Sequence, residues 1–150
     1  MMIIEARYYP EIVDELARGA IQVLEQHGST YKRFEVPGAF EVPAAVRMAI
    51  RSMDFSLDRR RFDGYVCLGC VIRGETSHYD IVANESARAL QNLACEFTLA
   101  LGYGIITCDT MEQAWERARV DRRNKGGEAA RTVLAMIELK RRLNLYPRQT

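Results

Sequence analysis

The chain has 150 residues, of which 48% are hydrophobic and 27% are charged, as is usual for a soluble globular protein. Its formal net charge of +1 predicts no broad basic surface, which argues against nucleic acid or an anionic membrane as a general partner. No apolar run is long enough to cross a bilayer, and Glu5 and Arg7 interrupt the apolar start, so we expect no signal peptide. One domain over residues 1–150, located in the cytoplasm, is the expectation.

The first half of the chain alternates between strand-like and helix-like patterns. Gly28 is suited to end the first helix, and Pro43 is tolerated in the first turn of the second. In chain order the patterns predict a strand, a helix, a strand and a helix over residues 2–4, 11–27, 31–36 and 42–53, followed by a polar connection over residues 54–63.

The second half continues this alternation. Residues 64–72 are apolar on both faces, which is typical of a central parallel strand covered on each side. Thr110 and Gln113 resemble a capping box at a helix start, and "DRRNKGG" interrupts the helical pattern further along. After the third strand the patterns predict a helix over 81–101 capped by Gly102, a strand over 104–108, a helix over 110–120, a last helix over 128–144 and a frayed tail over 146–150.

Repeated alternation of strands and helices predicts a three-layer α/β fold with a parallel sheet between two layers of helices. In such sheets ligands bind outside the carboxyl ends of the strands. We therefore expect a functional site among the four segments that follow the predicted strands, namely "ARYYP", "PGAFE", "RGETSH" and "TCDT".

His78 lies at the start of a predicted helix, after the polar segment that ends the third strand. A helix N-terminus disfavours imidazolium, so we expect a neutral ring that can accept a proton and return it. A histidine at this position can equally cap the helix, and position alone does not separate the two roles. His27 ends a surface-like helix and is expected to be plainly exposed.

Two groups of residues are candidates for binding an anion. Residues 74–77 precede a helix and can present backbone N–H groups and hydroxyls, although an N-cap segment without a ligand has the same composition. Arg117 and Lys125 belong to a basic cluster that can clamp a phosphate, but spacing alone favours a solvated helix face.

Aromatic residues in the loops are candidates for binding a flat ring. Tyr8 and Phe40 lie outside the periodic core positions and can stack on a heterocycle or act as hydrophobic plugs. Glu41, next to Phe40, can accept hydrogen bonds from hydroxyls or cap the following helix.

Cys67 and Cys70 form a C-x-x-C, a spacing found in zinc sites and redox proteins. Within a strand, however, positions three apart point to opposite faces, and no second C-x-x-C or histidine pair completes a zinc site. A redox pair normally begins a helix, where the dipole lowers the thiol pKa. We therefore interpret both as buried, reduced, structural cysteines and expect no metal site.

Four segments together resemble the lumazine synthase family, the 6,7-dimethyl-8-ribityllumazine synthases of riboflavin biosynthesis. They are "VPGAFEVP" (36–43), "GCVIRGETSHYD" (69–80), "EQAWERA" (112–118) and "NKGG" (124–127), and the match extends from about residue 4 to about residue 143. The resemblance implies a flavodoxin-like α/β/α sandwich, here with four predicted strands. It also implies condensation of 5-amino-6-(D-ribitylamino)uracil with 3,4-dihydroxy-2-butanone 4-phosphate, with release of phosphate and water and without a cofactor.

The resemblance assigns roles to residues in these segments. His78 matches the family's proton-transfer residue, and Arg117 matches its phosphate-binding arginine. Glu75 and Thr76 match positions that bind the butanone phosphate. The positions that contact the pyrimidine or its ribityl chain are Tyr8, Ala39, Phe40, Glu41, Cys70, Val71, Ile72, Lys125 and Tyr103, of which Tyr103 reaches in from a neighbouring subunit.

The resemblance further implies a homo-oligomer built from pentamers, with sites between adjacent subunits, and riboflavin synthase as a candidate partner that uses the product. Two other classes of function remain open. A flavin- or lumazine-binding protein without the chemistry would not need both His78 and Arg117, and a C-x-x-C oxidoreductase is disfavoured by the strand position of the cysteines. Cys70 and Glu75 stand where many members have threonine and alanine.

Overall fold

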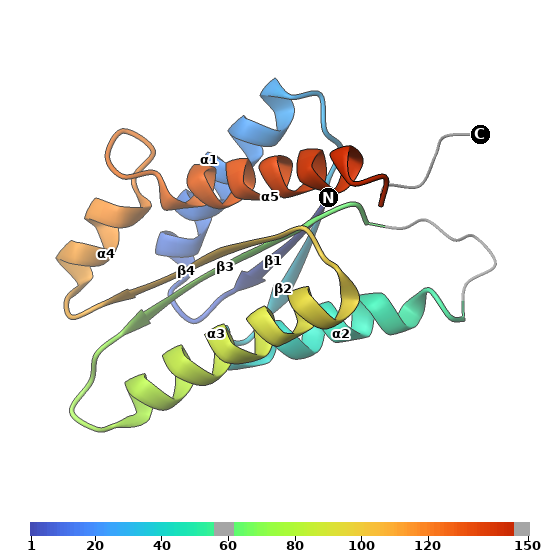
Figure 1. Cartoon of the computed structure of the whole chain (residues 1–150). Coiled ribbons are helices and arrows are strands. Elements are labelled where there is room, and N and C mark those ends of the chain that lie inside the picture. Colours follow the sequence, from blue (N-terminus) through green and yellow to red (C-terminus); the bar gives the residue numbers. More distant parts are fainter. Residues whose placement is uncertain (56–61, 146–150) are drawn as a thin grey trace.

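The computed structural model of the chain describes residues 1–55 and 62–145. In these ranges four strands form one sheet, and all neighbours run parallel in the order β2-β1-β3-β4 (Figure 1). This order is that of the first four strands of flavodoxin-like folds. The strands span Met2–Ala6 (β1), Lys32–Val36 (β2), Tyr65–Ile72 (β3) and Leu101–Cys108 (β4).

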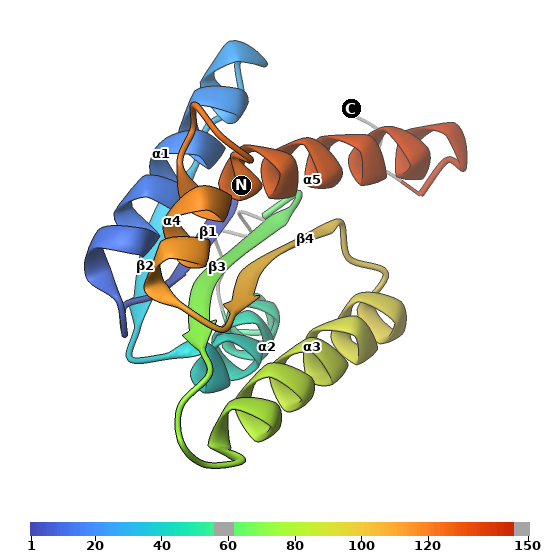
Figure 2. The same cartoon turned by 90° about the vertical axis from the view of Figure 1, so that its left-hand side faces the viewer.

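Helices cover both faces of the sheet, so the predicted three-layer α/β fold is confirmed. One face carries α1 (Pro10–Gln26), α4 (Met111–Ala118) and α5 (Lys125–Arg142), and the other carries α2 (Val42–Ser52) and α3 (His78–Phe97), as Figures 1 and 2 show. Two hydrophobic clusters result, one between the sheet and each helical layer. Exclusion of water from these two clusters is the main stabilising term of the fold.

Strand β3 is the centre of the molecule. Seven of its eight residues are buried, as the apolar pattern predicts for a strand that is covered on both faces. Val66 and Leu68 pack into the cluster of α1 and α5, whereas Cys67 packs into the cluster of α2 and α3. Cys70 belongs to the first cluster, so the two cysteines of the C-x-x-C lie on opposite faces and both are free. A disulfide or a shared metal between them is excluded by this arrangement.

The last helix begins earlier than the sequence pattern predicts, because "NKGG" starts α5 instead of breaking it. Asn124 caps the helix in the left-handed region, at φ 45°, and its side-chain oxygen accepts a hydrogen bond from Gly127 N at 3.2 Å. A Cβ at Gly126 would overlap the Leu16 carbonyl of α1. The glycine therefore allows α5 to pack closely on α1, and this contact outweighs its poor helix propensity.

The end of α3 is also placed wrongly by the sequence pattern. The helix ends at Phe97, and Thr98 forms the C-cap in the left-handed region, at φ 56°, with its N–H donating to the Ala94 carbonyl. Gly102, the predicted cap, instead lies in β4, which begins at Leu101. A Cβ at Gly102 would overlap the Ala129 carbonyl, so this glycine permits close approach of α5 to the sheet.

The remaining differences are small. Helix α4 ends at Ala118, two residues before the predicted end. The Thr110 hydroxyl accepts from Gln113 N at 3.2 Å as predicted, while Gln113 Oε1 accepts from Asp109 N at 2.8 Å. Most of the predicted polar connection (56–61) and the predicted frayed tail (146–150) lie outside the described residues. None of the helices described combines the length and apolar character needed to cross a bilayer.

Candidate active site

A cavity of about 510 Å³ opens at the carboxyl edge of the sheet, where the sequence places the candidate site. Its walls come from the segments that follow β1, β2 and β3 and from the start of α3. Nine of the predicted site residues line it, namely Tyr8, Ala39, Phe40, Glu41, Cys70, Val71, Ile72, Thr76 and His78. The chain thus brings together in one hollow residues that are up to 70 positions apart (78 minus 8).

Tyr8 and Phe40 give the cavity two exposed aromatic side chains. Tyr8 is 71% exposed and Phe40 is 54% exposed, so neither ring is a plug in the core of this chain. Tyr8 contacts Tyr9 edge to face, with ring centroids 4.9 Å apart, which leaves Tyr8 to present apolar surface to the cavity. An exposed ring beside a cavity is suited to stacking on a flat heterocycle.

The segment after β2 forms a short 3-10 helix, η1 (Ala39–Glu41). Ala39 is buried and anchors this turn against the α2 and α3 layer, while Phe40 and Glu41 are exposed. Glu41 is the N-cap residue of α2, but its side chain makes no capping hydrogen bond. One of its carboxylate oxygens lies close to Gly38. The Glu41 carboxylate therefore remains available to accept hydrogen bonds from ligand hydroxyls.

The end of β3 forms the floor of the cavity. The Cys70 side chain turns into the core beside Cys108, whose hydrogen bond, together with burial, raises the pKa of the Cys70 thiol. The thiol is therefore protonated at neutral pH and is no nucleophile. Val71 packs into the opposite cluster, so this stretch presents largely backbone groups to the cavity.

His78 is the first residue of α3 and is exposed at the cavity. Ser77 is the N-cap residue, and the Thr76 hydroxyl accepts a hydrogen bond from the His78 backbone N–H at 3.3 Å. In the part of the chain that the structure describes, no hydrogen bond holds the His78 ring. The ring nitrogens are thus free to form hydrogen bonds with a ligand. Glu75 is exposed and lies outside the cavity lining, whereas Gly74 and Thr76 belong to it.

The other three predicted residues, Tyr103, Arg117 and Lys125, line a second hollow of about 230 Å³ along β4, the edge strand. Among the described residues, the two hollows have no lining residue in common. Arg117 Nη1 donates to the Gln113 carbonyl at 3.3 Å, and Lys125 Nζ lies 2.9 Å from Glu128 Oε2. Tyr103 is 42% exposed, and burial of the rest of it raises the pKa of its phenol. One chain therefore does not assemble the full predicted ligand set.

The family model of 6,7-dimethyl-8-ribityllumazine synthase matches residues 1–141. The chain belongs to this family.

Relatives in the lumazine synthase family match along most of their length. The 6,7-dimethyl-8-ribityllumazine synthase 1 of Rhizobium meliloti is 53% identical over 143 residues, which cover 95% of this chain and 92% of the relative. The 6,7-dimethyl-8-ribityllumazine synthase of Agrobacterium fabrum is 51% identical over 143 residues, with 95% of each chain covered. That of Bartonella tribocorum is 49% identical over 142 residues. The family resemblance read from the sequence segments is thereby confirmed.

Sequence reasoning missed several residues that line the two hollows of this lumazine synthase family member. Tyr79 and Val82 lie one and four positions after His78, and a helical projection from His78 would have indicated that Val82 shares its face. Glu128 follows directly on "NKGG" and pairs with Lys125. The missed residues of the main cavity are Tyr9, Pro37, Gly38, Tyr79 and Val82, whereas Gly74 belongs to the predicted anion-binding segment 74–77.

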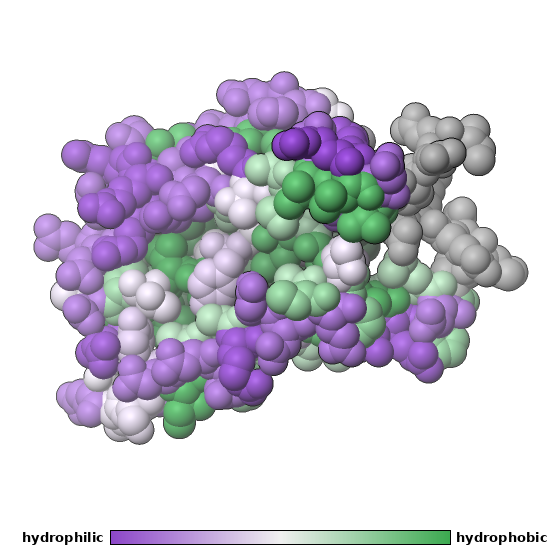
Figure 3. All heavy atoms as spheres, viewed as in Figure 1, coloured by the Kyte–Doolittle hydropathy of each residue, from purple (hydrophilic) through white to green (hydrophobic). Residues whose placement is uncertain are grey.

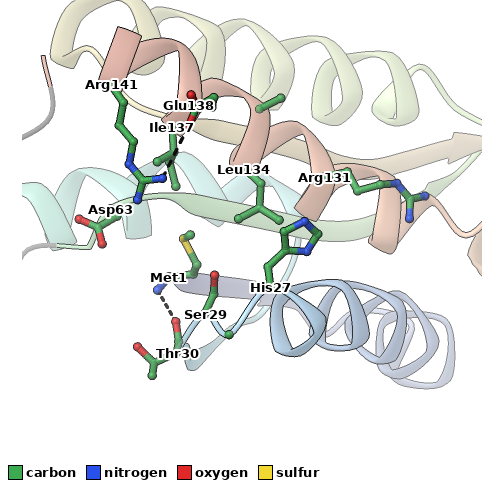
Figure 4. A pocket seen from close by; sticks show the side chains of 12 residues that line it. Met1, His27, Ser29, Thr30, Asp63, Arg131, Leu134, Ile137, Glu138 and Arg141 are labelled. Atoms are coloured by element: carbon green, nitrogen blue, oxygen red, sulfur yellow. Dashed lines mark hydrogen bonds and ion pairs between the residues drawn. The ribbon is translucent and has the colours of Figure 1, made fainter. Parts of the chain in front are cut away.

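A larger hollow, of about 700 Å³, lies at the opposite end of the sheet and contains none of the predicted site residues. Figure 4 shows its lining, in which Leu134 and Ile137 of α5 face His27 and the segment before β2. Its charges are mixed: Arg141 Nη1 lies 3.7 Å from Glu138 Oε2. His27 is exposed, as predicted. Within the described residues, no cluster of three or more His, Cys, Asp or Glu side chains could hold a metal ion.

Proposed function

We propose that this chain, acting as one domain, is a 6,7-dimethyl-8-ribityllumazine synthase. It condenses 5-amino-6-(D-ribitylamino)uracil with 3,4-dihydroxy-2-butanone 4-phosphate and releases phosphate and water. One observation carries the proposal: in a chain of this family, nine of the thirteen predicted ligand residues line a single cavity at the carboxyl edge of the sheet. No cofactor takes part, and the reaction rests on protein side chains and the backbone.

The cavity is suited to the pyrimidine. Tyr8 and Phe40 offer exposed apolar surface for the ring, and the end of β3 offers backbone groups to its edge. Glu41, whose carboxylate is not used in capping α2, accepts hydrogen bonds from the ribityl hydroxyls. These contacts fix the ring with its free amine toward the start of α3.

His78 is the proton-transfer residue of the proposed mechanism. The pyrimidine amine attacks the ketone carbonyl, and the carbinolamine loses water to form an imine, while the His78 ring accepts and returns protons. Elimination of phosphate follows, and ring closure with dehydration completes the product. Because much of the rate comes from holding two substrates together, loss of His78 slows the reaction without abolishing it.

The phosphate is bound by the backbone at residues 74–76, by the Thr76 hydroxyl and by Arg117. The start of α3 directs N–H groups toward this position, which favours an anion there. Arg117 adds a charge-assisted hydrogen bond that strengthens as the phosphate leaves. Within one chain, however, Arg117 lines the 230 Å³ hollow along β4 (the β4 hollow) and not the 510 Å³ cavity at the carboxyl edge of the sheet (the main cavity).

We therefore propose that the working site lies between two copies of the chain. The β4 edge of a neighbouring subunit supplies Tyr103, Arg117 and Lys125 to the main cavity. An interface that joins two different faces of the same chain repeats head to tail, and it closes into a ring when the rotation between neighbours divides a full turn. From the family resemblance we propose a ring of five.

The exposed apolar surface is in keeping with such an assembly. Figure 3 shows hydrophobic side chains gathered near the C-terminal part of α5, on the face that presents β4. The exposed hydrophobic residues in and directly after this part of α5 are Met136, Leu139, Leu143 and Leu145. Contiguous apolar surface of this kind commonly marks a protein–protein interface. Riboflavin synthase, which uses the product, is the proposed partner enzyme, and we place the activity in the cytoplasm.

A turnover assay tests the proposal. The purified protein is incubated with both substrates, and formation of the lumazine is followed by its absorbance together with release of inorganic phosphate. We expect both products in equal amounts, and His78→Ala should lower kcat with little change in the Kd of the pyrimidine. Tight binding of the pyrimidine without any turnover would instead identify a lumazine-binding protein and contradict the proposed function.

A further inference from the structure

Arg73 makes four contacts where β3 ends, and none of them is explained by the proposed chemistry. Its backbone N–H donates to the Cys108 carbonyl at 2.9 Å, which extends the pairing of β3 with β4 by one residue. Its Nε lies 2.9 Å from Asp109 Oδ1, and its Nη1 lies 3.8 Å from Asp80 Oδ1. The guanidinium carbon lies 4.3 Å from the centroid of the Tyr79 ring.

These contacts join the start of α3, which borders the cavity, to the segment that follows β4. Tyr79 and Asp80 belong to the first turn of α3, directly after His78. Asp109 follows β4, and its backbone is held by Gln113 of α4 through a 2.8 Å hydrogen bond. One guanidinium therefore ties the start of α3 to the end of β4. Arg73 itself does not belong to the cavity lining.

Two other contacts hold the start of α3: the Thr76 hydroxyl accepts a hydrogen bond from the His78 N–H at 3.3 Å, and Tyr79 packs against the cluster of α2 and α3. Residues 73–78 are exposed, and Ser77 makes no side-chain capping hydrogen bond. A helix start whose N-cap side chain makes no hydrogen bond frays more readily than a fully capped one, and its first residues then sample several positions. A planar guanidinium that pairs with carboxylates and stacks on an aromatic ring restricts such motion better than a lysine can.

We propose that Arg73 is a positioning residue for His78, holding the first turn of α3 so that the imidazole stays at the reacting atoms. This inference rests on the proposed function. The Arg73 pairs are half exposed, so their loss changes global stability little. Misplacement of a proton-transfer group, in contrast, lowers the rate steeply. The two consequences are therefore separable by experiment.

A double-mutant cycle tests the inference. We expect Arg73→Gln to lower kcat by about tenfold, and by no more than His78→Ala does, with little change in the KM of either substrate. In the His78→Ala background the same change should alter kcat by less than about twofold, because the group it positions is gone. An equal loss in both backgrounds, or no loss in the native one, overturns the inference.

Arg51 offers a matched control. It also pairs with a carboxylate, Asp54 at 2.8 Å, and lies over an aromatic ring, Phe55 at 5.0 Å, but at the far end of α2 from η1. Arg51→Gln should leave kcat within about twofold of the native value. A loss as large as that of Arg73→Gln would show that any such surface contact matters, and the inference would fail.

Hydrogen exchange gives a readout that does not depend on turnover. The amides of Asp80 and Ile81 donate to the Ser77 carbonyl at 3.0 and 3.3 Å. In Arg73→Gln their exchange should accelerate by about tenfold, while amides within α2 keep their native rates. Unchanged exchange at both positions overturns the inference even if kcat falls. A native protein that shows no turnover refutes the proposed function, and the exchange rates then still decide whether Arg73 holds this turn.

Discussion

Arg33 forms a two-point ion pair with Glu5, whose side chain is only 1% exposed. Arg33 Nε and Nη2 lie 2.7 and 2.8 Å from the two carboxylate oxygens, and Arg7 Nη1 lies 3.4 Å from one of them. Glu5 is on β1 and Arg33 is on β2, the edge strand. The pair therefore fastens the edge of the sheet beside the loop that carries Tyr8.

We predict that Arg33→Met lowers the free energy of unfolding by about 1.5–3 kcal/mol, because it removes charged hydrogen bonds and leaves a buried carboxylate poorly paired. Thermal or urea unfolding at fixed protein concentration measures this loss. The double change Glu5→Met with Arg33→Met should be less destabilising than Arg33→Met alone, since no unpaired charge remains.

Arg88 provides the control for this prediction. It pairs with Glu85 at 2.6 Å, but both side chains are exposed. Arg88→Met should destabilise the protein much less than Arg33→Met, because water screens the exposed pair. A loss for Arg33→Met no larger than that for Arg88→Met would show that the buried pair has no special role.

The contacts of the Glu15 carboxylate lead us to expect that the protein loses stability in acid. It accepts hydrogen bonds from Arg18 and, at 3.0 Å, from the backbone N–H of Val120 after α4. The Arg18 hydrogen bond, followed by that of Val120, lowers the pKa of the Glu15 carboxyl. A lowered folded-state pKa stabilises the protein above the unfolded-state pKa, and this stabilisation is lost as the pH falls through the folded-state value.

Native protein should therefore lose stability between about pH 5 and about pH 3, and Glu15→Gln should lose less over the same interval. The melting temperature measured across this interval gives the two slopes. Parallel curves for the two proteins would show that Glu15 makes no contribution to acid sensitivity.

The positions of the cysteines lead us to expect that a reductant does not change the activity. Burial raises the pKa of the Cys67 thiol, and Cys67 and Cys70 lie in opposite clusters, whereas Cys95 is exposed. Activity should be equal with and without reductant, and a maleimide should label the folded protein at Cys95 before the other cysteines. Mass spectrometry of the labelled peptides reads this out. A Cys67–Cys70 disulfide or a stoichiometric zinc ion would refute the structural role.

We expect that replacing Arg117 weakens the binding of only one of the two substrates. Arg117→Ala should weaken binding of the butanone phosphate by about 1.5–3 kcal/mol, the usual contribution of a charged hydrogen bond, with little effect on the pyrimidine. Equilibrium binding of each substrate alone measures both values. Arg123, which is exposed and lies outside the β4 hollow, is the control. Equal weakening of both substrates would indicate a structural role for Arg117.

Local pattern predicts this fold well where burial on both faces dictates residue type. The apolar stretch of β3 and the helical spacing of α1 and α2 are of this kind, and the sequence bounds agree with the structure within two residues. The position of the main cavity follows from the same pattern, because parallel strands place their carboxyl ends at one edge.

The local sequence pattern does not contain information on contacts between segments that are far apart in the chain. Gly102 and Gly126 read locally as breaks, yet each is required where α5 packs, on the sheet and on α1 respectively. The division of the ligand residues between two hollows is equally absent from the local sequence. It follows from the position of β4 at the sheet edge, which carries Tyr103 away from the cavity.

The most direct test of the central claim, a condensing site shared by two copies of the chain, is complementation between two impaired variants. His78→Ala and Arg117→Ala are each purified, mixed in equal amounts, dissociated and reassembled. In a head-to-tail ring, a site between two subunits regains both native residues in about a quarter of random pairings. We therefore predict lumazine formation at about a quarter of the native rate, well above either variant alone. Activity that stays at the average of the two variants would contradict the claim.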